Sequence, residues 1–136
     1  MSRQVLSASS TILLDTTVLI DSLRGRNQRR ALLASLVASG QALATSTVNI
    51  AEVYGGLRPG EEIGTRVLLD SLEWFPVSGA IAETAGQLKA KLRRQGQTRS
   101  ITDMIVVATA LEYGFAVATD NLRDFQIPGL ALYPLP

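Results

Sequence analysis

The sequence predicts a single α/β domain in which helices flank a largely parallel central sheet. Short apolar runs of strand length alternate with stretches of helical periodicity along the chain, a pattern typical of parallel β-α-β folds. With 136 residues, the chain is long enough for one ordinary domain and too short for two. The sequence contains no linker, internal repeat or low-complexity segment. We therefore expect one domain over residues 1–136.

The first half of the chain opens with a short apolar run that ends at an acid, Asp15, as expected of a buried strand. Gly25 and Gly40 follow two stretches of helical periodicity and are expected to end them. Either Ser46 or Thr47 is expected to cap the next helix. The expected elements are a strand at 11–14, helices at 18–23 and 28–39, a strand at 42–45, and helices at 47–54 and 61–72.

The second half continues the alternation with longer helices. Its most apolar stretch begins at Asp103 and ends before Gly114, which predicts a buried helix. The expected elements are a weak strand at 73–77, a helix at 81–94, a polar loop at 97–101, a helix at 103–113, and strands at 115–118 and 130–133.

The composition excludes several classes of enzyme. The chain has no Cys, which rules out disulfides, thiolate metal sites and Cys nucleophiles, and no His, which rules out a Ser-His-Asp triad. Its two lysines, Lys89 and Lys91, are a poor supply for amine catalysis. Any hydrolytic chemistry therefore rests mainly on carboxylates. The net charge of +1 does not by itself indicate a nucleic-acid partner.

The apolar segments also bear on location. None approaches the roughly 18–20 residues that a membrane-spanning helix needs. Residues 1–10 lack the continuous apolar stretch of a signal peptide. We expect a cytoplasmic protein that makes no membrane contact.

Four acids stand where a charge is costly. Asp15 and Asp120 follow expected strands, Glu52 interrupts an apolar helix, and Asp103 begins the most apolar helix. The carboxyl ends of parallel strands share one edge, where functional crevices lie. Buried carboxylates need a partner, and one divalent cation can serve several of them. Oxygen-only ligands favour Mg²⁺ or Mn²⁺ over Zn²⁺.

Each acid also has a purely structural interpretation. Asp15 can cap the following helix, and Asp103 fits a capping box that begins at Ser100. Glu52 can lie on a solvated helix face, and Asp120 can belong to a turn. Any one acid is weak support for a site, whereas the placement of all four at strand ends and helix starts favours one.

The order of the motifs resembles that of the PIN-domain nucleases, specifically the VapC toxins of type II toxin–antitoxin pairs. The matching segments run in the family's order and cover nearly the whole chain. They are Leu14-Asp-Thr-Thr-Val-Leu-Ile-Asp21, Thr45-Ser-Thr-Val-Asn-Ile-Ala-Glu-Val-Tyr-Gly55, Ile101-Thr-Asp-Met-Ile-Val-Val-Ala-Thr-Ala110 and Ala118-Thr-Asp-Asn-Leu-Arg-Asp-Phe125, the last followed by Ile127-Pro-Gly-Leu130.

The resemblance implies an acidic pocket that holds the metal, formed by Asp15, Glu52 and Asp103, with Thr16 beside it. In many relatives the fourth acid falls where this chain has Asn121, between Asp120 and Asp124. We expect Asp120 to be the fourth acid, because it directly follows a predicted strand. Asp124, four residues further on, is the alternative.

The activity implied by the resemblance is that of an Mg²⁺- or Mn²⁺-dependent endoribonuclease, which hydrolyses RNA phosphodiester bonds with a metal-activated water. The implied partner is a cognate VapB-like antitoxin, with a toxin homodimer and a larger complex with the antitoxin. A PIN nuclease that is not a toxin is one alternative, and a PIN fold that only binds is another.

A phospho-acceptor signalling domain is a further, unfavoured alternative. A response-regulator receiver expects a Lys at the end of a late strand, whereas Lys89 and Lys91 lie in a predicted helix. A phosphatase of the haloacid dehalogenase type expects an Asp two residues after Asp15, where this chain has Thr17.

Overall fold

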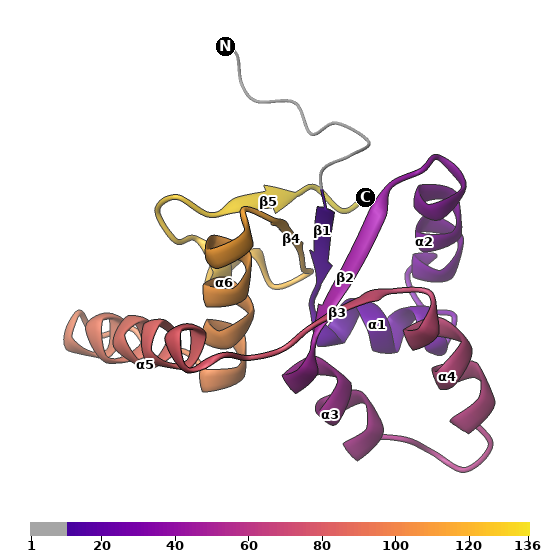
Figure 1. The fold of residues 1–136 in the computed structure, drawn as a ribbon, viewed down its shortest axis with the longest axis horizontal. Helices are drawn as coiled ribbons and strands as arrows, with labels where there is room; N and C mark the ends of the chain where they lie inside the picture. Colours follow the sequence, from indigo (N-terminus) through magenta and orange to yellow (C-terminus); the bar gives the residue numbers. More distant parts are fainter. Residues whose placement is uncertain (1–10) are drawn as a thin grey trace.

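The computed structural model describes residues 11–136 and forms a parallel sheet, shown in Figure 1. All neighbouring strands pair in parallel, in the order β3-β2-β1-β4-β5. The predicted α/β class and parallel sheet are confirmed. The expectation for residues 1–10 lies outside the described part of the chain. The strands are β1 (Thr11–Leu14), β2 (Ala42–Ser46), β3 (Glu73–Phe75), β4 (Ala116–Ala118) and β5 (Ala131–Tyr133).

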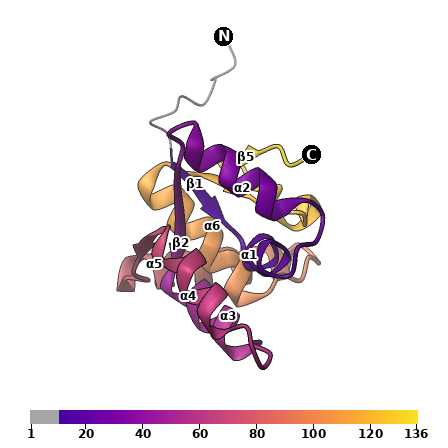
Figure 2. The same cartoon turned by 90° about the vertical axis from the view of Figure 1, so that its right-hand side faces the viewer.

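Helices cover both faces of the sheet. One layer contains α5 and α6, and the other contains α1 to α4, which faces the viewer in Figure 2. Within residues 11–136, no helix combines the length and apolar character needed to cross a membrane. The helices are α1 (Thr16–Leu23), α2 (Arg29–Ala38), α3 (Thr47–Gly55), α4 (Glu62–Asp70), α5 (Gly79–Arg94) and α6 (Ile101–Tyr113).

Strand β1 lies at the centre of the sheet and is buried on both faces. Successive side chains of a strand point to opposite faces. Leu13 accordingly packs into the core under α5 and α6, whereas Ile12 and Leu14 pack into the core under α1 to α4. All three side chains are fully buried. This explains why β1 reads as a continuous apolar run rather than an alternating one.

Three helices begin two residues before the positions predicted from apolar periodicity, because a polar side chain caps each of them. The periodicity reports the first side chain that enters the core, whereas the backbone turn starts at the cap. Each cap side chain accepts a hydrogen bond from a backbone N–H in the first turn. Asp15 caps α1 and accepts from Thr16 at 2.9 Å, Ser78 caps α5 and accepts from Ile81 at 3.2 Å, and Ser100 caps α6 and accepts from Asp103 at 3.0 Å.

Two further local features differ from the sequence prediction. Leu122–Phe125 forms a 3₁₀ helix, η1, which the sequence pattern does not predict. Its apolar anchor is Phe125, which is fully buried. Strand β3 ends at Phe75, two residues earlier than expected, because Pro76 has no N–H to donate to the neighbouring strand.

The strand order reverses direction at β1. The chain proceeds from β1 to β2 and β3 on one side, and then places β4 on the other side of β1. The backbone N–H of Asp15 donates to the Ala118 carbonyl at 3.1 Å, which holds the carboxyl ends of β1 and β4 together. Such a reversal point opens a crevice beyond the strand ends, where ligands bind in α/β sheets.

Candidate active site

Asp15 lies at this reversal point with a buried side chain that is only 4% exposed. Oδ1 accepts from Thr16 N at 2.9 Å, and Oδ2 accepts from the Thr119 hydroxyl at 2.9 Å. Burial raises the pKa of Asp15 to about 6, and the charges of Asp103 and Glu52 act in the same direction. The hydrogen bonds from Thr119 and Thr16 oppose this rise. A nearby cation would stabilise the charged form of this carboxyl group.

Glu52 lies on α3 and is tied to the end of β1 through hydroxyl and amide groups. The Thr16 hydroxyl donates to Glu52 Oε1 at 2.6 Å. Asn49 Nδ2, one turn earlier on α3, donates to Thr16 Oγ1 at 2.7 Å. The buried Ser46 hydroxyl donates to Asn49 Oδ1 at 2.6 Å. This chain of hydrogen bonds sets the direction of an otherwise exposed glutamate.

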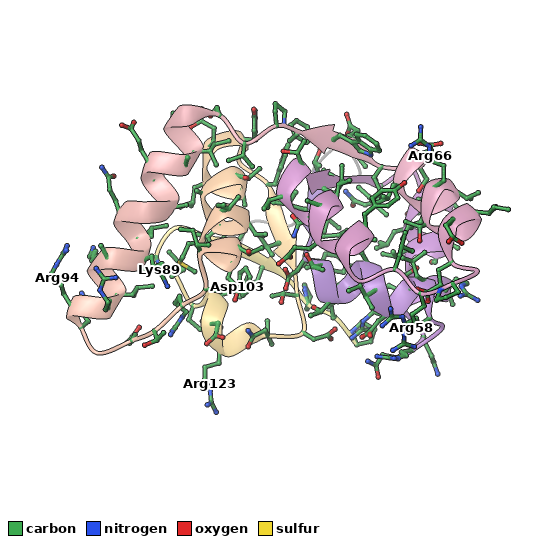
Figure 3. All side chains as sticks on the ribbon, turned by 90° about the horizontal axis from the view of Figure 1, so that it is seen from below. Arg58, Arg66, Lys89, Arg94, Asp103 and Arg123 are labelled. Atoms are coloured by element: carbon green, nitrogen blue, oxygen red, sulfur yellow. The ribbon has the colours of Figure 1, made fainter. Side chains whose placement is uncertain are left out.

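Asp103 lies in the first turn of α6 and is partly buried. Figure 3 shows it near the middle of the lower face, with Arg66, Arg94 and Arg123 toward the periphery. Burial raises the pKa of Asp103, and the charges of Asp124 and Glu52 raise it further. The bond from Ser100 and the charge of Arg99 lower it. Asp103 therefore both belongs to the capping box and interacts with the other acids.

Asp124 lies close enough to Asp103 for its charge to raise that pKa. Asn121 Nδ2 donates to Asp124 Oδ2 at 2.8 Å. Arg99 donates through Nε to the Asp124 carbonyl at 3.2 Å, and the same nitrogen lies 3.7 Å from Asp124 Oδ1. The 3₁₀ helix η1 thus turns Asp124 toward the acids on the other elements.

Asp120, the residue expected from the sequence as the fourth acid, has a different partner. Arg29 Nη2 lies 2.5 Å from Asp120 Oδ1, in an ion pair with a buried guanidinium. The charges of Asp103 and Glu52 raise the pKa of Asp15, and those of Asp124 and Glu52 raise the pKa of Asp103. Asp124 thus acts on Asp103, whereas Asp120 is paired with Arg29, and the identity of the fourth acid stays a prediction. The strand-end rule placed Asp120 at the correct edge but did not account for Arg29.

The donor set fits a magnesium-like cation bound through few protein ligands. Among residues 11–136, no three acids converge as a complete protein cage would require. Mg²⁺ usually keeps several waters and takes one or two carboxylates together with substrate phosphates. Asp15 has no Lys or Arg partner among the ion pairs of residues 11–136, so no positively charged side chain neutralises its buried carboxyl group.

The raised pKa of Asp15 predicts that stability without metal falls as the pH rises. The folded pKa of about 6 exceeds the ordinary value of 3.8, so the folded protein holds this proton more tightly than the unfolded chain. The stabilisation is complete below about pH 4 and is lost through about pH 6, with about 3 kcal/mol as an upper bound. Asp15→Asn should remove this dependence. Urea unfolding of both proteins in a chelator measures it, and parallel pH profiles would contradict it.

Sequence reasoning missed the residues that orient the acids. Asn49 and Thr119 are buried polar residues that contact Thr16 and Asp15, and Arg99 contacts Asp124. Asn49 had a usable signal, because it stands one helical turn before Glu52 in an apolar stretch. Thr119 and Arg99 had no such signal in the sequence, because their contacts are with residues far away in the chain.

Comparison with known proteins gives consistent similarities. The PIN domain family model matches residues 12–128. Ribonuclease VapC10 from Mycobacterium tuberculosis is 36% identical over 116 residues, covering 85% of this chain and 86% of that protein. A toxin–antitoxin complex from Klebsiella pneumoniae superposes with a TM-score of 0.72 at 29% identity, covering 91% of this chain and 99% of that chain. The crystal structure of VapBC2 from Rickettsia felis bound to a DNA fragment from their promoter shares the fold, with a TM-score of 0.77 at 22% identity over 90% of this chain and 97% of that chain.

Proposed function

The chain belongs to the PIN-domain family, and on that premise we propose that it is a metal-dependent endoribonuclease acting as the toxin of a VapBC-like pair. The observation that carries the proposal is the buried, cation-deficient Asp15 at the β1–β4 reversal point, with Glu52 and Asp103 acting on it. RNA is the proposed substrate. A homodimer, and a larger complex with the antitoxin, are part of the same proposal.

In this mechanism, Asp15 and Asp103 would hold Mg²⁺ or Mn²⁺, with Glu52 and Asp124 completing the acidic site. When bound, the ion would bind the scissile phosphate and lower the pKa of the attacking water. Thr16 and Thr119 fix the direction of the carboxyl groups of Glu52 and Asp15. Glu52 is the most exposed of the four, so solvent water can reach its carboxylate.

Positive charge for the substrate has to come from arginines around the acids, because carboxylates repel phosphates. Arg123 is exposed on η1, and Arg94 is exposed at the end of α5. Their guanidinium groups suit bidentate contacts with phosphate oxygens. In this proposal, the peripheral arginines bind the RNA backbone and the acids at the centre cleave it.

We expect Asp124→Asn to weaken Mn²⁺ binding on the order of 10–100-fold, and Asp120→Asn to change it little. The reason is that Asp124 acts electrostatically on Asp103, whereas Asp120 is paired with Arg29. Calorimetric titration of Mn²⁺ into the two purified variants measures the difference. The two variants are matched controls, since each removes one charge from the same loop. A larger loss in Asp120→Asn would make Asp120 the fourth acid after all.

The proposed antitoxin needs a surface on this chain, and an apolar groove between α2 and α4 suits an apolar segment of a partner. The groove has a volume of about 560 Å³. Its walls include Leu33 and Val37 of α2, and Val67 and Leu68 of α4. Val37 and Val67 are 50% and 67% exposed, which is costly for apolar side chains left without a partner.

Val67→Glu should leave growth arrest by the toxin intact but abolish its relief by the antitoxin encoded beside it. A charge on the groove wall should cost the apolar partner segment about 1–3 kcal/mol of binding. The control is Ile63→Glu, on the same helix and 81% exposed but outside the groove. Growth of cells that express each variant, with and without the neighbouring gene, measures the effect.

Two outcomes of that experiment would contradict the proposal. Equal rescue of Val67→Glu and the parent protein would reject the groove as the antitoxin surface. Harmless expression of a folded, RNA-cleaving parent protein would reject the toxin role and leave a PIN nuclease with another function.

A further inference from the structure

A second cavity, of about 940 Å³, opens beside the acidic site between the starts of α1 and α2. Its lining is mixed, with more polar side chains than the groove between α2 and α4. Thr17 and Asp21 line it from α1, Asn27 and Arg29 from the start of α2, and Asp120 from the loop after β4. We call it the α1–α2 pocket. The proposed catalytic acids do not line it, and the apolar groove does not include it.

The side chains of the pocket are fixed by one another. Asn27 Nδ2 donates to Asp21 Oδ2 at 2.9 Å, and Arg29 Nη2 donates to Asp120 Oδ1 at 2.5 Å. Among residues 11–136, no donor reaches Asp21 Oδ1 or Asp120 Oδ2. The pocket therefore presents two oriented carboxylate oxygens that still lack partners.

Two features mark the α1–α2 pocket as a built site rather than a surface hollow. Arg29 is 4% exposed and donates to the carbonyl oxygens of Asn27 and Pro136 as well as to Asp120, while its buried Nε has no hydrogen-bond partner in the described residues. Asn27 and Gln28 have φ values of 52° and 57°, a left-handed conformation that costs non-glycine residues free energy. Surrounding contacts hold this backbone turn in place, and the turn carries Asn27 and Arg29 into the wall.

The pocket is directly connected to the acidic site. The Thr17 hydroxyl, on its wall, donates to Asp15 Oδ2 at 3.4 Å. Asp120 directly follows Thr119, whose hydroxyl donates to the same oxygen at 2.9 Å. A nucleotide next to a phosphate bound at Asp15 is therefore within reach of the pocket.

We propose that the α1–α2 pocket holds the base of a nucleotide adjacent to the scissile phosphate and selects bases that present N–H donors. The inference rests on the proposed ribonuclease function and adds a source of sequence preference. Guanine is the best fit, because it presents two neighbouring donors, N1–H and N2–H₂, and Asp21 and Asp120 each leave one oxygen without a donor. Adenine and cytosine offer one amino group each. Uracil is the poorest fit, because two carbonyl oxygens flank its only N–H.

The negative charge of the pocket makes it possible to distinguish binding of a base from binding of a phosphate. Asp21 and Asp120 repel phosphates, so a phosphate in the pocket would bind more tightly when Asp21 loses its charge. A base that donates to Asp21 would bind less tightly. Base-edge hydrogen bonds of this kind are the usual means of reading single-stranded RNA.

The test is Asp21→Asn, measured with short oligoribonucleotides that share one background sequence and differ only at two adjacent central positions, so that no known cleavage site is required. Each position carries guanine, uracil or an abasic ribose. Binding is measured in EDTA by fluorescence anisotropy, so that no cleavage is required. We expect the parent protein to favour guanine over uracil by on the order of 5- to 100-fold at one of the positions. Asp21→Asn should lose that preference and leave the abasic RNA bound as before.

Two further variants serve as controls for Asp21→Asn. Asn27→Gly keeps the positive φ and the charge of Asp21 but removes the donor that orients it, so the preference should shrink without vanishing. Glu83→Gln makes the same charge change at an exposed position of α5, away from the pocket, and should leave the preference unchanged.

Two outcomes would overturn the proposal. One is that Asp21→Asn binds the guanine RNA as tightly as the parent protein or more tightly. The other is that Asp21→Asn loses equal affinity for the guanine RNA and the abasic RNA. Failure of the parent protein to cleave any RNA would refute the proposed function. The guanine preference in EDTA is measured independently of that result, so the two failures are distinguishable.

Discussion

Asp15→Asn and Asp103→Asn should each abolish RNA cleavage by the purified protein while leaving the fold intact. The amide keeps the shape of the side chain but removes the charge that would hold a cation. Losses of at least on the order of 100-fold are expected, since even outer-shell partners of a metal contribute about 10–100-fold. Asp15 is nearly fully buried and lies near both Asp103 and Glu52, so water cannot replace the charge that the substitution removes. Cleavage of a labelled RNA and circular dichroism of each variant measure activity and fold.

The matched control for these variants is Asp70→Asn, which removes an aspartate from the exposed end of α4. Asp70 pairs with Arg66 four residues earlier, with both side chains more than half exposed, so its loss should matter little. Retained cleavage in Asp15→Asn or Asp103→Asn would reject the acidic site. Loss of cleavage in Asp70→Asn would show that the assay reports stability rather than chemistry.

Removal of divalent metal should stop cleavage completely, and Mg²⁺ or Mn²⁺ should restore it. The physical reason is that the site offers carboxylate oxygens only, and the chain has neither His nor Cys to favour a softer metal. Without the ion, the acids would repel the scissile phosphate, so RNA would bind more weakly and no water would be activated. Activity in EDTA, and after readdition of each metal, measures the requirement.

A second readout separates metal binding from chemistry. An ion that binds only the folded protein raises its melting temperature by mass action. Mn²⁺ should therefore stabilise the parent protein and have a much smaller effect on Asp15→Asn. Cleavage that persists after thorough chelation would contradict the metal mechanism, provided that Asp103→Asn prepared in parallel shows no contaminating ribonuclease.

The strand pattern and most helix positions are predictable because they depend on short-range features. The run 11–14 is apolar enough to form a strand buried on both faces, and Ser100 three residues before Asp103 predicts a helix start. The same local signals put Asp15 at the end of the central strand and Asp103 in the first turn of α6. The absence of His and Cys is a property of composition alone, and it leaves carboxylates as the main candidates for hydrolytic chemistry whatever the fold.

The partners of Asp120 and Asp124 are determined only by the tertiary structure, and the identity of the fourth acid stays a prediction. Both residues follow β4, and the only local difference between them is that Asp120 lies nearer the strand end whereas Asp124 lies in η1. Their partners come from elsewhere in the chain: Arg29 is 91 residues from Asp120, and Arg99 is 25 residues from Asp124. Hydrogen bonds and ion pairs depend on distances of a few ångströms, and those distances exist only once the sheet has brought separate elements together. Sequence determined which residue types reach this edge of the sheet, and tertiary packing determined which of them face one another.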